Sequence, residues 1–302
     1  MYEQFYGLRE APFSLTPDTE YFYRYSGHQE ALNVLLVALR NGEGFVRVTG
    51  EVGTGKTLLC RRLLQLLQED CATAYLPNPL LTGHELYQAI AADLQLKLAP
   101  EATVQQLYQA LFAELVRLKE NSTPVVVLID EAQAMSHRSL EAIRLLSNLE
   151  TEKEKLLHII FFAQPEFEQR LAQPQLRQLR QRISFSYQLQ TLGRGEIPAY
   201  LEHRLRVAGL QGPTLFSAAA TRLLHRASQG VPRLLNQLAH KALLVGYGKG
   251  LRRIGRQQVA AAIRDTPGLK LNGRAFLPPY LLELSVCVLV AAATLFAWRV
   301  LQ

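Results

Sequence analysis

A glycine-rich loop ending in a lysine–threonine pair constrains this 302-residue chain more than any other feature. It follows the apolar run Phe45–Thr49 and reads Gly50-Glu51-Val52-Gly53-Thr54-Gly55-Lys56-Thr57. This is the P-loop pattern, in the strand–loop–helix context that it requires. Its backbone N–H groups can close around phosphate oxygens, and the helix expected from Lys56 adds the positive end of its dipole. We expect all eight residues to bind nucleotide, with Lys56 on the β- and γ-phosphates and Thr57 on Mg²⁺.

A second apolar run, Val125–Ile129, ends in the carboxylates Asp130 and Glu131. Such a run is typical of a parallel strand buried on both faces. The carboxyl end of that strand faces the crevice in which open α/β sheets bind ligands. We expect Asp130 to hold the Mg²⁺ shell and Glu131 to polarise the attacking water.

Missing motifs narrow the chemistry further. The sequence has no Asn-Lys-x-Asp motif for reading guanine and no Leu-Ser-Gly-Gly-Gln signature of transporter cassettes. A small-molecule kinase would not need a glutamate beside the aspartate. The remaining class is an ATP hydrolase with an additional strand between the P-loop strand and the Asp130 strand.

Apolar runs alternate with helical patterns up to residue 191, and only helical patterns follow. We expect strands at Phe45–Thr49, Ala72–Leu76, Val125–Ile129, Leu156–Ala163 and Ile183–Leu189. The expected helices between them are Ser26–Arg40, one opened by the capping box at Thr82, Thr103–Lys119, Ser136–Glu150 and Glu166–Gln178. Those after the break are Glu196–Val207, Ser217–Ala227, Pro232–Tyr247 and Arg256–Asp265. The alternation predicts a parallel, right-handed α/β sheet with a helical unit behind it.

We divide the chain into an aromatic N-terminal lead (1–30), an α/β core (31–191), a helical unit (192–266), a linker (267–279) and an apolar segment (280–298). Most aromatic residues of the lead are interpreted as core rather than as a frame for a nucleotide base. His28 and His203 are interpreted as packing or surface residues. The cysteines Cys60, Cys71 and Cys287 lack metal-ligand spacing, which indicates a reducing compartment.

Residues 280–298 have the length and composition of a single membrane span. Tyr280 and Trp298 lie where interfacial aromatic residues belong, and Glu283 lies one turn inside. Basic residues precede the segment and only Arg299 follows it, so the positive-inside rule places the bulk of the chain in the cytoplasm. The alternative is a helix that binds a partner protein. The net charge of +7 is compatible with nucleic acid, an anionic membrane or nucleotide phosphate.

The order and the residues of these motifs resemble those of the secretion ATPases known as general secretion pathway protein A or ExeA, which are AAA+ ATPases. The resemblance covers roughly residues 1–265. It is carried by Met1–Leu8, Ala11–Asp18, Gly50–Thr57, Ile129–Gln133, Leu146–Thr151, Gln164–Glu166, Leu179–Ile183 and Gly230–Arg233.

The resemblance implies a P-loop AAA+ parallel sheet core with a C-terminal all-α lid, and the apolar segment 280–298 adds a C-terminal transmembrane helix. It implies ATP and Mg²⁺ as cofactors and a homo-oligomer as the working form. The implied activity is ATP hydrolysis that drives assembly of a type IV pilus, of the mannose-sensitive haemagglutinin (MSHA) kind, or of a type II secretion-related complex. Its partners would be inner-membrane components of that pilus or secretion system in a bacterium.

The same resemblance assigns roles to further residues. Gln164 falls at the sensor 1 position and Arg233 at the sensor 2 position. Arg182 falls where these ATPases supply an arginine finger to a neighbour's site, with Arg180 as the second choice. Asn78 is a candidate for restraining Glu131.

Two other functions remain open. A DNA-binding ATPase of the transposition-helper type shares this core, but no helix-turn-helix or aromatic-interleaved basic stretch is recognisable, so nucleic acid is not the expected partner. A non-catalytic nucleotide switch is disfavoured because Lys56, Thr57, Asp130 and Glu131 are all intact.

Overall fold

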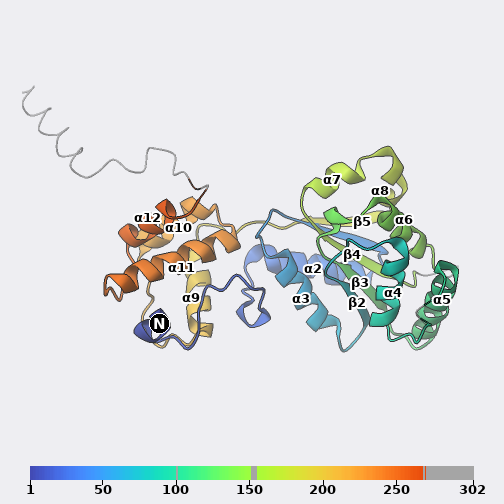
Figure 1. Cartoon of the computed structure of the whole chain (residues 1–302), viewed down its shortest axis with the longest axis horizontal. Helices are drawn as coiled ribbons and strands as arrows, with labels where there is room; N and C mark the ends of the chain where they lie inside the picture. The colour runs from blue at the N-terminus through green and yellow to red at the C-terminus, as the bar shows by residue number, and fades with distance from the viewer. Residues whose placement is uncertain (100, 151–154, 268, 270–302) are drawn as a thin grey trace, which may run out of the picture.

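Parallel strands form the centre of the core in the computed structural model, which describes residues 1–99, 101–150, 155–267 and 269 (Figure 1). Within these residues the sheet has the order β2-β3-β4-β1-β5. The strands are β1 (Phe45–Thr49), β2 (Ala72–Leu76), β3 (Val125–Ile129), β4 (His158–Ala163) and β5 (Ile183–Gln188). The order confirms the parallel α/β sheet and places β4 between β1 and β3, as the additional strand predicted from the motifs.

Both faces of the sheet are covered by helices (Figure 1). Val126 and Leu128 of β3 face α2 (Ser26–Arg40) and α3 (Lys56–Leu67). The alternate residues of the same strand belong to the cluster on the opposite face. That cluster is formed with α4 (Gly83–Asp93), α5 (Val104–Glu120) and α6 (His137–Leu146). Every residue of β3 is buried, as expected for a central parallel strand.

The expected helix over Glu166–Gln178 is wrong as a single element. The structure has α7 (Glu166–Leu171), a 3-10 turn at Pro174–Leu176, and α8 (Arg177–Arg182). Pro174 has no N–H to donate and its ring opposes a continuous helix, so the chain turns there.

Several predicted ends also shift. α6 ends at Leu146 rather than Glu150, where the hydroxyl of Ser147 donates to the Arg144 carbonyl at 2.6 Å. Strand β4 begins at His158 rather than Leu156. Ser26 is the first residue of α2 and not its N-cap, which is Tyr25.

Four helices form the lid within the described residues: α9 (Ile197–Val207), α10 (Ala218–Ser228), α11 (Pro232–Gly248) and α12 (Arg256–Arg264). They match the four helices predicted after residue 191. Leu205, Leu224, Leu238 and Val259 are fully buried, one from each helix. Each lid helix therefore places an apolar stripe in one shared core.

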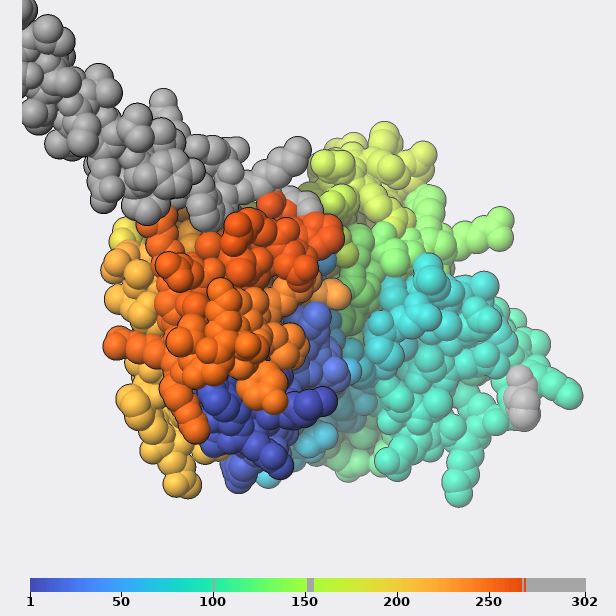
Figure 2. All heavy atoms as spheres, turned by 60° about the vertical axis from the view of Figure 1, so that its left-hand side comes forward, coloured from blue at the N-terminus to red at the C-terminus, as the bar shows by residue number. Residues whose placement is uncertain are grey.

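The N-terminal segment packs on the lid, as Figure 2 shows for the residues beside α11. It begins with α1 (Tyr2–Tyr6), a helix that the sequence did not predict. The Tyr6 hydroxyl donates to the Leu243 carbonyl at 3.1 Å, and the rings of Phe13 and Phe216 lie 5.9 Å apart. The interpretation of these aromatic residues as core is confirmed, and the core that they complete is the lid's.

Core and lid are joined by two chain segments that are bonded to one another. One passes through Tyr25 and Ser26, and the other runs from Gln190 into α9. The Tyr25 hydroxyl donates to the Gln190 carbonyl at 2.8 Å, and the Ser26 N–H donates to the Glu196 carboxylate at 3.0 Å. The two crossings therefore form one connection.

The predicted membrane span at 280–298 lies outside the described residues. Among the residues that are described, no helix combines the length and apolar character needed to cross a bilayer.

Candidate functional site

The glycine-rich loop joins the end of β1 to the start of α3, at the carboxyl edge of the sheet. Gly53 and Gly55 have positive φ angles of 82° and 97°, which only glycine adopts without strain. A Cβ on Gly53 would lie 2.7 Å from the Cβ of Arg233, so this glycine also permits the close approach of α11. Gly55 is the N-cap of α3, so the loop leads directly into the N-terminus of a helix, whose free N–H groups can bind phosphate.

Lys56 is buried at the centre of this loop, with 5% of its surface exposed. Its Nζ donates to the carbonyls of Gly50 at 2.7 Å and Glu51 at 3.0 Å. Burial lowers the pKa of Lys56, while the carboxylates of Glu131 and Asp130 act in the opposite direction. Nearby negative charge therefore supports the ammonium form that a phosphate-binding lysine needs.

Asp130 and Thr57 face one another beneath the loop. Asp130 is 2% exposed, accepts a hydrogen bond from the Glu131 N–H at 2.9 Å and is hydrogen-bonded by the Thr57 side chain. Burial raises the pKa of Asp130, and the bond from Thr57 opposes that rise. A hydroxyl and a carboxylate are the oxygen ligands that Mg²⁺ takes from proteins when substrate phosphates and water complete its shell. The residues present therefore fit a nucleotide-bound Mg²⁺.

Glu131 adopts a left-handed backbone conformation with a φ of 51°, which is unusual for a residue other than glycine. Its carboxylate accepts hydrogen bonds from the side-chain amides of Gln133 and Gln164, the latter at 3.1 Å. The side-chain amide oxygen of Gln133 in turn accepts from the backbone N–H of Gln164 at 3.0 Å. Strain of this kind persists where surrounding contacts hold it and is common at functional sites.

Gln133 belongs to the site, although the sequence placed it only within the motif Ile129–Gln133 and predicted no role for it. It lies in the 3-10 turn Ala132–Ala134, directly after Glu131. Its spacing of two residues from Glu131 was the available signal, because a tight turn brings such side chains together. The structure makes it the link between Glu131 and the end of β4.

These residues border a cavity of about 180 Å³ between core and lid. Gly53, Lys56, Thr57, Glu131 and Gln164 line it from the core. The lid contributes Tyr200, Arg204, Pro232, Arg233 and Asn236, and the N-terminal segment contributes Ser14–Asp18. Arg233 follows Gly53 by 180 residues in the sequence, and the fold brings it to the loop. Its backbone N–H donates to the Gly53 carbonyl at 3.1 Å.

Arg204 is a lining residue that the sequence did not indicate. Its guanidinium is buried, lies 4.6 Å from the centre of the Tyr21 ring and donates to the carbonyls of Pro12 at 2.6 Å and Ser14 at 3.2 Å. It therefore fastens the N-terminal wall of the cavity to α9. The signal was invisible in sequence because almost two hundred residues separate the two.

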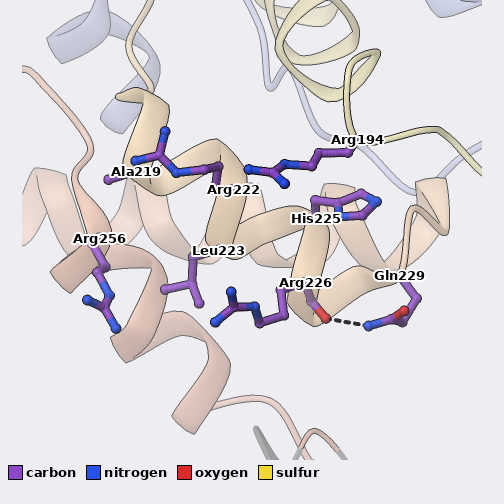
Figure 3. A pocket seen from close by; sticks show the side chains of 8 residues that line it. All are labelled: Arg194, Ala219, Arg222, Leu223, His225, Arg226, Gln229 and Arg256. Atoms are coloured by element: carbon purple, nitrogen blue, oxygen red, sulfur yellow. Dashed lines mark hydrogen bonds between the residues drawn. The ribbon is translucent and has the colours of Figure 1, made fainter. Parts of the chain in front are cut away.

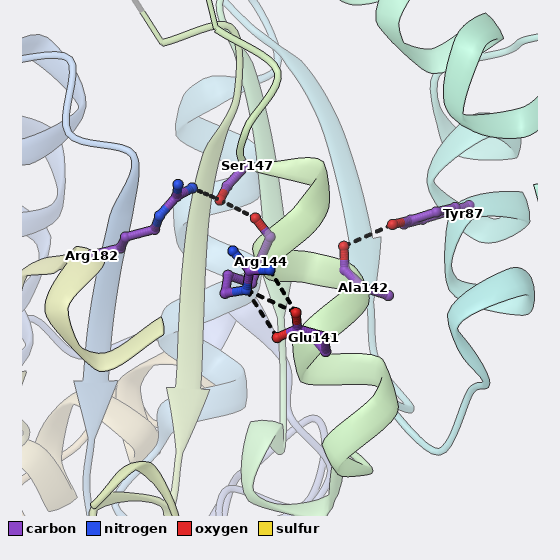
Figure 4. Close-up of polar contacts among 6 residues, drawn as sticks. All are labelled: Tyr87, Glu141, Ala142, Arg144, Ser147 and Arg182. Atoms are coloured by element: carbon purple, nitrogen blue, oxygen red, sulfur yellow. Dashed lines mark hydrogen bonds and ion pairs between the residues drawn. The ribbon is translucent and has the colours of Figure 1, made fainter. Parts of the chain in front are cut away.

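The two candidate finger residues lie outside the cavity. Arg182 ends α8 and its Nη1 donates to the Ser147 hydroxyl at 2.6 Å (Figure 4). Nearby, Arg144 pairs with Glu141 at 2.6 Å, and Arg180 is exposed. Among the described residues neither arginine lines the cavity, so a role at an ATP site would require the site of another copy.

Asn78 does not restrain Glu131, and that expectation is wrong. The Asn78 side-chain oxygen accepts from the Leu80 N–H at 3.2 Å, in a local turn after β2. Within the described residues, the side-chain partners of Glu131 are the two glutamines. A short amide that can bond its own following backbone favours the local turn.

The two histidines are packing residues, as expected. His28 stacks on Phe22 with ring centres 5.1 Å apart and lies 4.2 Å from the Tyr25 ring. Burial lowers the pKa of His28 to about 4. His203 lies against Tyr23 at 5.3 Å.

The strand order, the P-loop and the carboxylate pair after β3 together define an α/β P-loop AAA+ fold. Residues 39–171 match the family model of the AAA domain. Among solved structures, Cdc6p from Pyrobaculum aerophilum aligns with a TM-score of 0.65 at 17% identity, covering 84% of this chain and 70% of its own. The ORC2 protein of Aeropyrum pernix, solved as ADPNP-ADP complexes, aligns with a TM-score of 0.60 at 17% identity, covering 93% and 80%. Identities this low show the fold alone.

The sequence itself is similar to general secretion pathway protein A of Aeromonas hydrophila. The two are 41% identical over 273 residues, which are 90% of this chain and 50% of that protein. The chain thus spans about half the length of this curated relative.

Proposed function

We propose that this chain is an ATP hydrolase that drives assembly of a pilus or secretion complex at the bacterial inner membrane. The observation that carries the enzymatic part is the position of Glu131, held by two glutamines at the cavity that Lys56 and Thr57 line. A carboxylate so placed serves as the base for a water that attacks the terminal phosphate. The similarity to general secretion pathway protein A supports the biological setting.

Each site residue has a separate task in this proposal. Lys56 and the loop N–H groups hold the phosphates, and Thr57 and Asp130 hold Mg²⁺, which neutralises charge developing on the phosphate oxygens. Glu131 accepts the proton of the water, while Gln164 positions Glu131 and the terminal phosphate. Arg233 reports the nucleotide to α11, because its backbone already contacts Gly53.

We propose residues 31–191 as the ATP-hydrolysing core and 192–266 as the lid. The working form is a homo-oligomer, in which Arg182 completes the site of a neighbour. Arg182 lies outside its own cavity, which supports a role in trans but leaves Arg180 as a second choice.

The finer assignment is to MshM, the ATPase of MSHA type IV pilus biogenesis. Three stretches resemble that protein in wording: Asn41–Phe45, Tyr75–Leu81 and Arg182–Gln190. The apolar segment 280–298 supports a single C-terminal span with the ATPase in the cytoplasm. Carbonate extraction of membranes tests that span, because a helix that only binds a partner would be released.

Hydrolysis is tested by comparing Glu131→Gln with Lys56→Ala. Glu131→Gln keeps an oxygen that accepts from Gln164, so ATP binding should persist while turnover falls by about 10² to 10⁴. Lys56→Ala should weaken binding itself. Glu120→Gln, at an exposed glutamate that ends α5 away from the cavity, is the matched control and should keep the wild-type rate within about twofold. Equal rates in wild type and Glu131→Gln would leave a nucleotide switch as the better description.

A DNA-dependent ATPase is the second candidate, and the arginine-rich surface of the lid favours it. Such an enzyme should shift a DNA duplex with an affinity that falls steeply with salt, and DNA should raise its ATPase rate. Absence of both effects would remove this candidate.

A further inference from the structure

A hollow of about 450 Å³ lies on the lid and shares no lining residue with the cavity at the P-loop. Its basic lining comes from three places: Arg194 after β5, Arg222, His225 and Arg226 on α10, and Arg256 on α12 (Figure 3). Within the described chain no aspartate or glutamate lines it.

Three of these arginines differ from Arg206 of α9 in the partners that the described residues give them. Arg194, Arg222 and Arg226 are exposed, and in the described part of the chain none pairs with a carboxylate. By contrast, Arg206 of α9 pairs with Glu202 at 3.1 Å. Positive groups that border one hollow repel each other, and a bound anion relieves that repulsion.

The groups that line the hollow indicate which kind of anion it can bind. The arginine side chains are distributed around Leu223, which is 5% exposed and forms an apolar floor (Figure 3). Guanidinium groups bind phosphate oxygens in pairs, which favours phosphate over a simple halide. A DNA duplex needs a strip of contacts along its backbone, whereas the basic side chains here line one hollow.

We propose that the hollow binds the phosphate of an anionic lipid headgroup. The lipid source rests on the membrane attachment proposed above. Helix α12 ends at Arg264, sixteen residues before the apolar segment at 280, so an extended chain keeps the lid within about 55 Å of the bilayer. Basic clusters on the cytoplasmic side of a span are the usual contacts for anionic lipids.

The test uses the full chain in a neutral detergent and titrates it with dihexanoyl-phosphatidylglycerol, dihexanoyl-phosphatidylcholine or inorganic phosphate. Binding is followed by calorimetry. Phosphatidylglycerol should bind at least about tenfold more tightly than either alternative. The double variant Arg222→Gln/Arg226→Gln should lose about fivefold per arginine, or about 25-fold in all, for phosphatidylglycerol. Both side chains are exposed, so its unfolding midpoint without lipid should match the wild type.

The control is Arg253→Gln/Arg264→Gln, which removes the same charge from exposed lid positions outside the hollow and should change affinity less than about twofold. Equal losses in both pairs, or no preference for phosphatidylglycerol over phosphatidylcholine, overturn the proposal. Equally tight binding of inorganic phosphate would identify a free-anion site instead. A DNA duplex that displaces the lipid at lower concentration would identify a nucleic-acid site. None of these readouts needs ATP turnover or membrane insertion, so a failure here is separate from a failure of the proposed function.

Discussion

The core and the lid differ in how far apart in the sequence their packed residues lie. The core's sheet and helices lie between Ser26 and Gln188 and pack on each other. The lid's apolar cluster instead combines residues after 191 with Tyr2, Tyr6, Phe13 and Tyr21. The same N-terminal segment supplies Ser14–Asp18 to the cavity wall. The shape of the nucleotide site therefore depends on lid packing as much as on the core.

The largest effect is expected where the comparison reaches beyond a single chain. Arg182 belongs to the core but lies outside its cavity, so Arg182→Ala should lower ATPase activity by about 10³ if it acts on a neighbour. Mixing it with Lys56→Ala protein should restore activity at interfaces that pair an intact loop with an intact arginine. Arg177→Ala, on an exposed position of the same helix, is the control. No recovery in confirmed mixed oligomers would rule out Arg182.

The contrast in range is tested most directly by Phe13→Ala. Phe13 is 2% exposed against Phe216, and its loss should destabilise the lid by about 3–4 kcal/mol. Hydrogen exchange should rise in α9 to α12 and remain unchanged in β3. Phe112→Ala, at a 42% exposed position of the core, should change neither region appreciably. Faster exchange in β3 would show that the two regions unfold together.

A smaller effect is expected in the pH dependence of the free energy of unfolding, to which a histidine of the core contributes. The pKa of His28 is lowered to about 4 by burial in the core, from about 6.5 when unfolded. The unfolded chain then binds the extra proton, so stability falls by about 3 kcal/mol as pH drops from about 6.5 to 4. His28→Leu should remove that part of the slope. Urea titrations of both proteins across this window measure it, and parallel curves would contradict the assignment.

Helix caps should give the smallest effects, and equal ones. Thr82 caps α4 in the core by accepting from the Glu85 N–H, and Ser217 caps α10 in the lid by accepting from the Ala220 N–H. Either residue changed to alanine should lose about 1 kcal/mol, because capping is local wherever the helix packs. Unequal losses in urea unfolding would show that tertiary context dominates.

What could be predicted from the sequence follows the same division by range. The P-loop, the buried β3 strand, the capping box at Thr82 and the helix that begins after Thr103 depend on neighbouring residues, and all are present. Gln164 and Arg233 could be placed because a resemblance carried information about distant segments. Neither Arg204 nor the lid partners of the N-terminal aromatic residues could be deduced, because no local pattern encodes which distant surface a side chain meets. Pro174 was a local signal, and the helix through it was a misreading of periodicity.

The paired crossings between core and lid restrict how these two bodies can rotate. A single flexible linker would leave the lid free to rotate about all three axes relative to the core. Here the two linkers are joined by the hydrogen bonds of Tyr25 to Gln190 and of Ser26 to Glu196. We expect this pair to favour rotation of the lid about one principal hinge axis. We expect a displacement of α11 at Gly53 to turn the lid about that axis, in a fixed direction relative to the core.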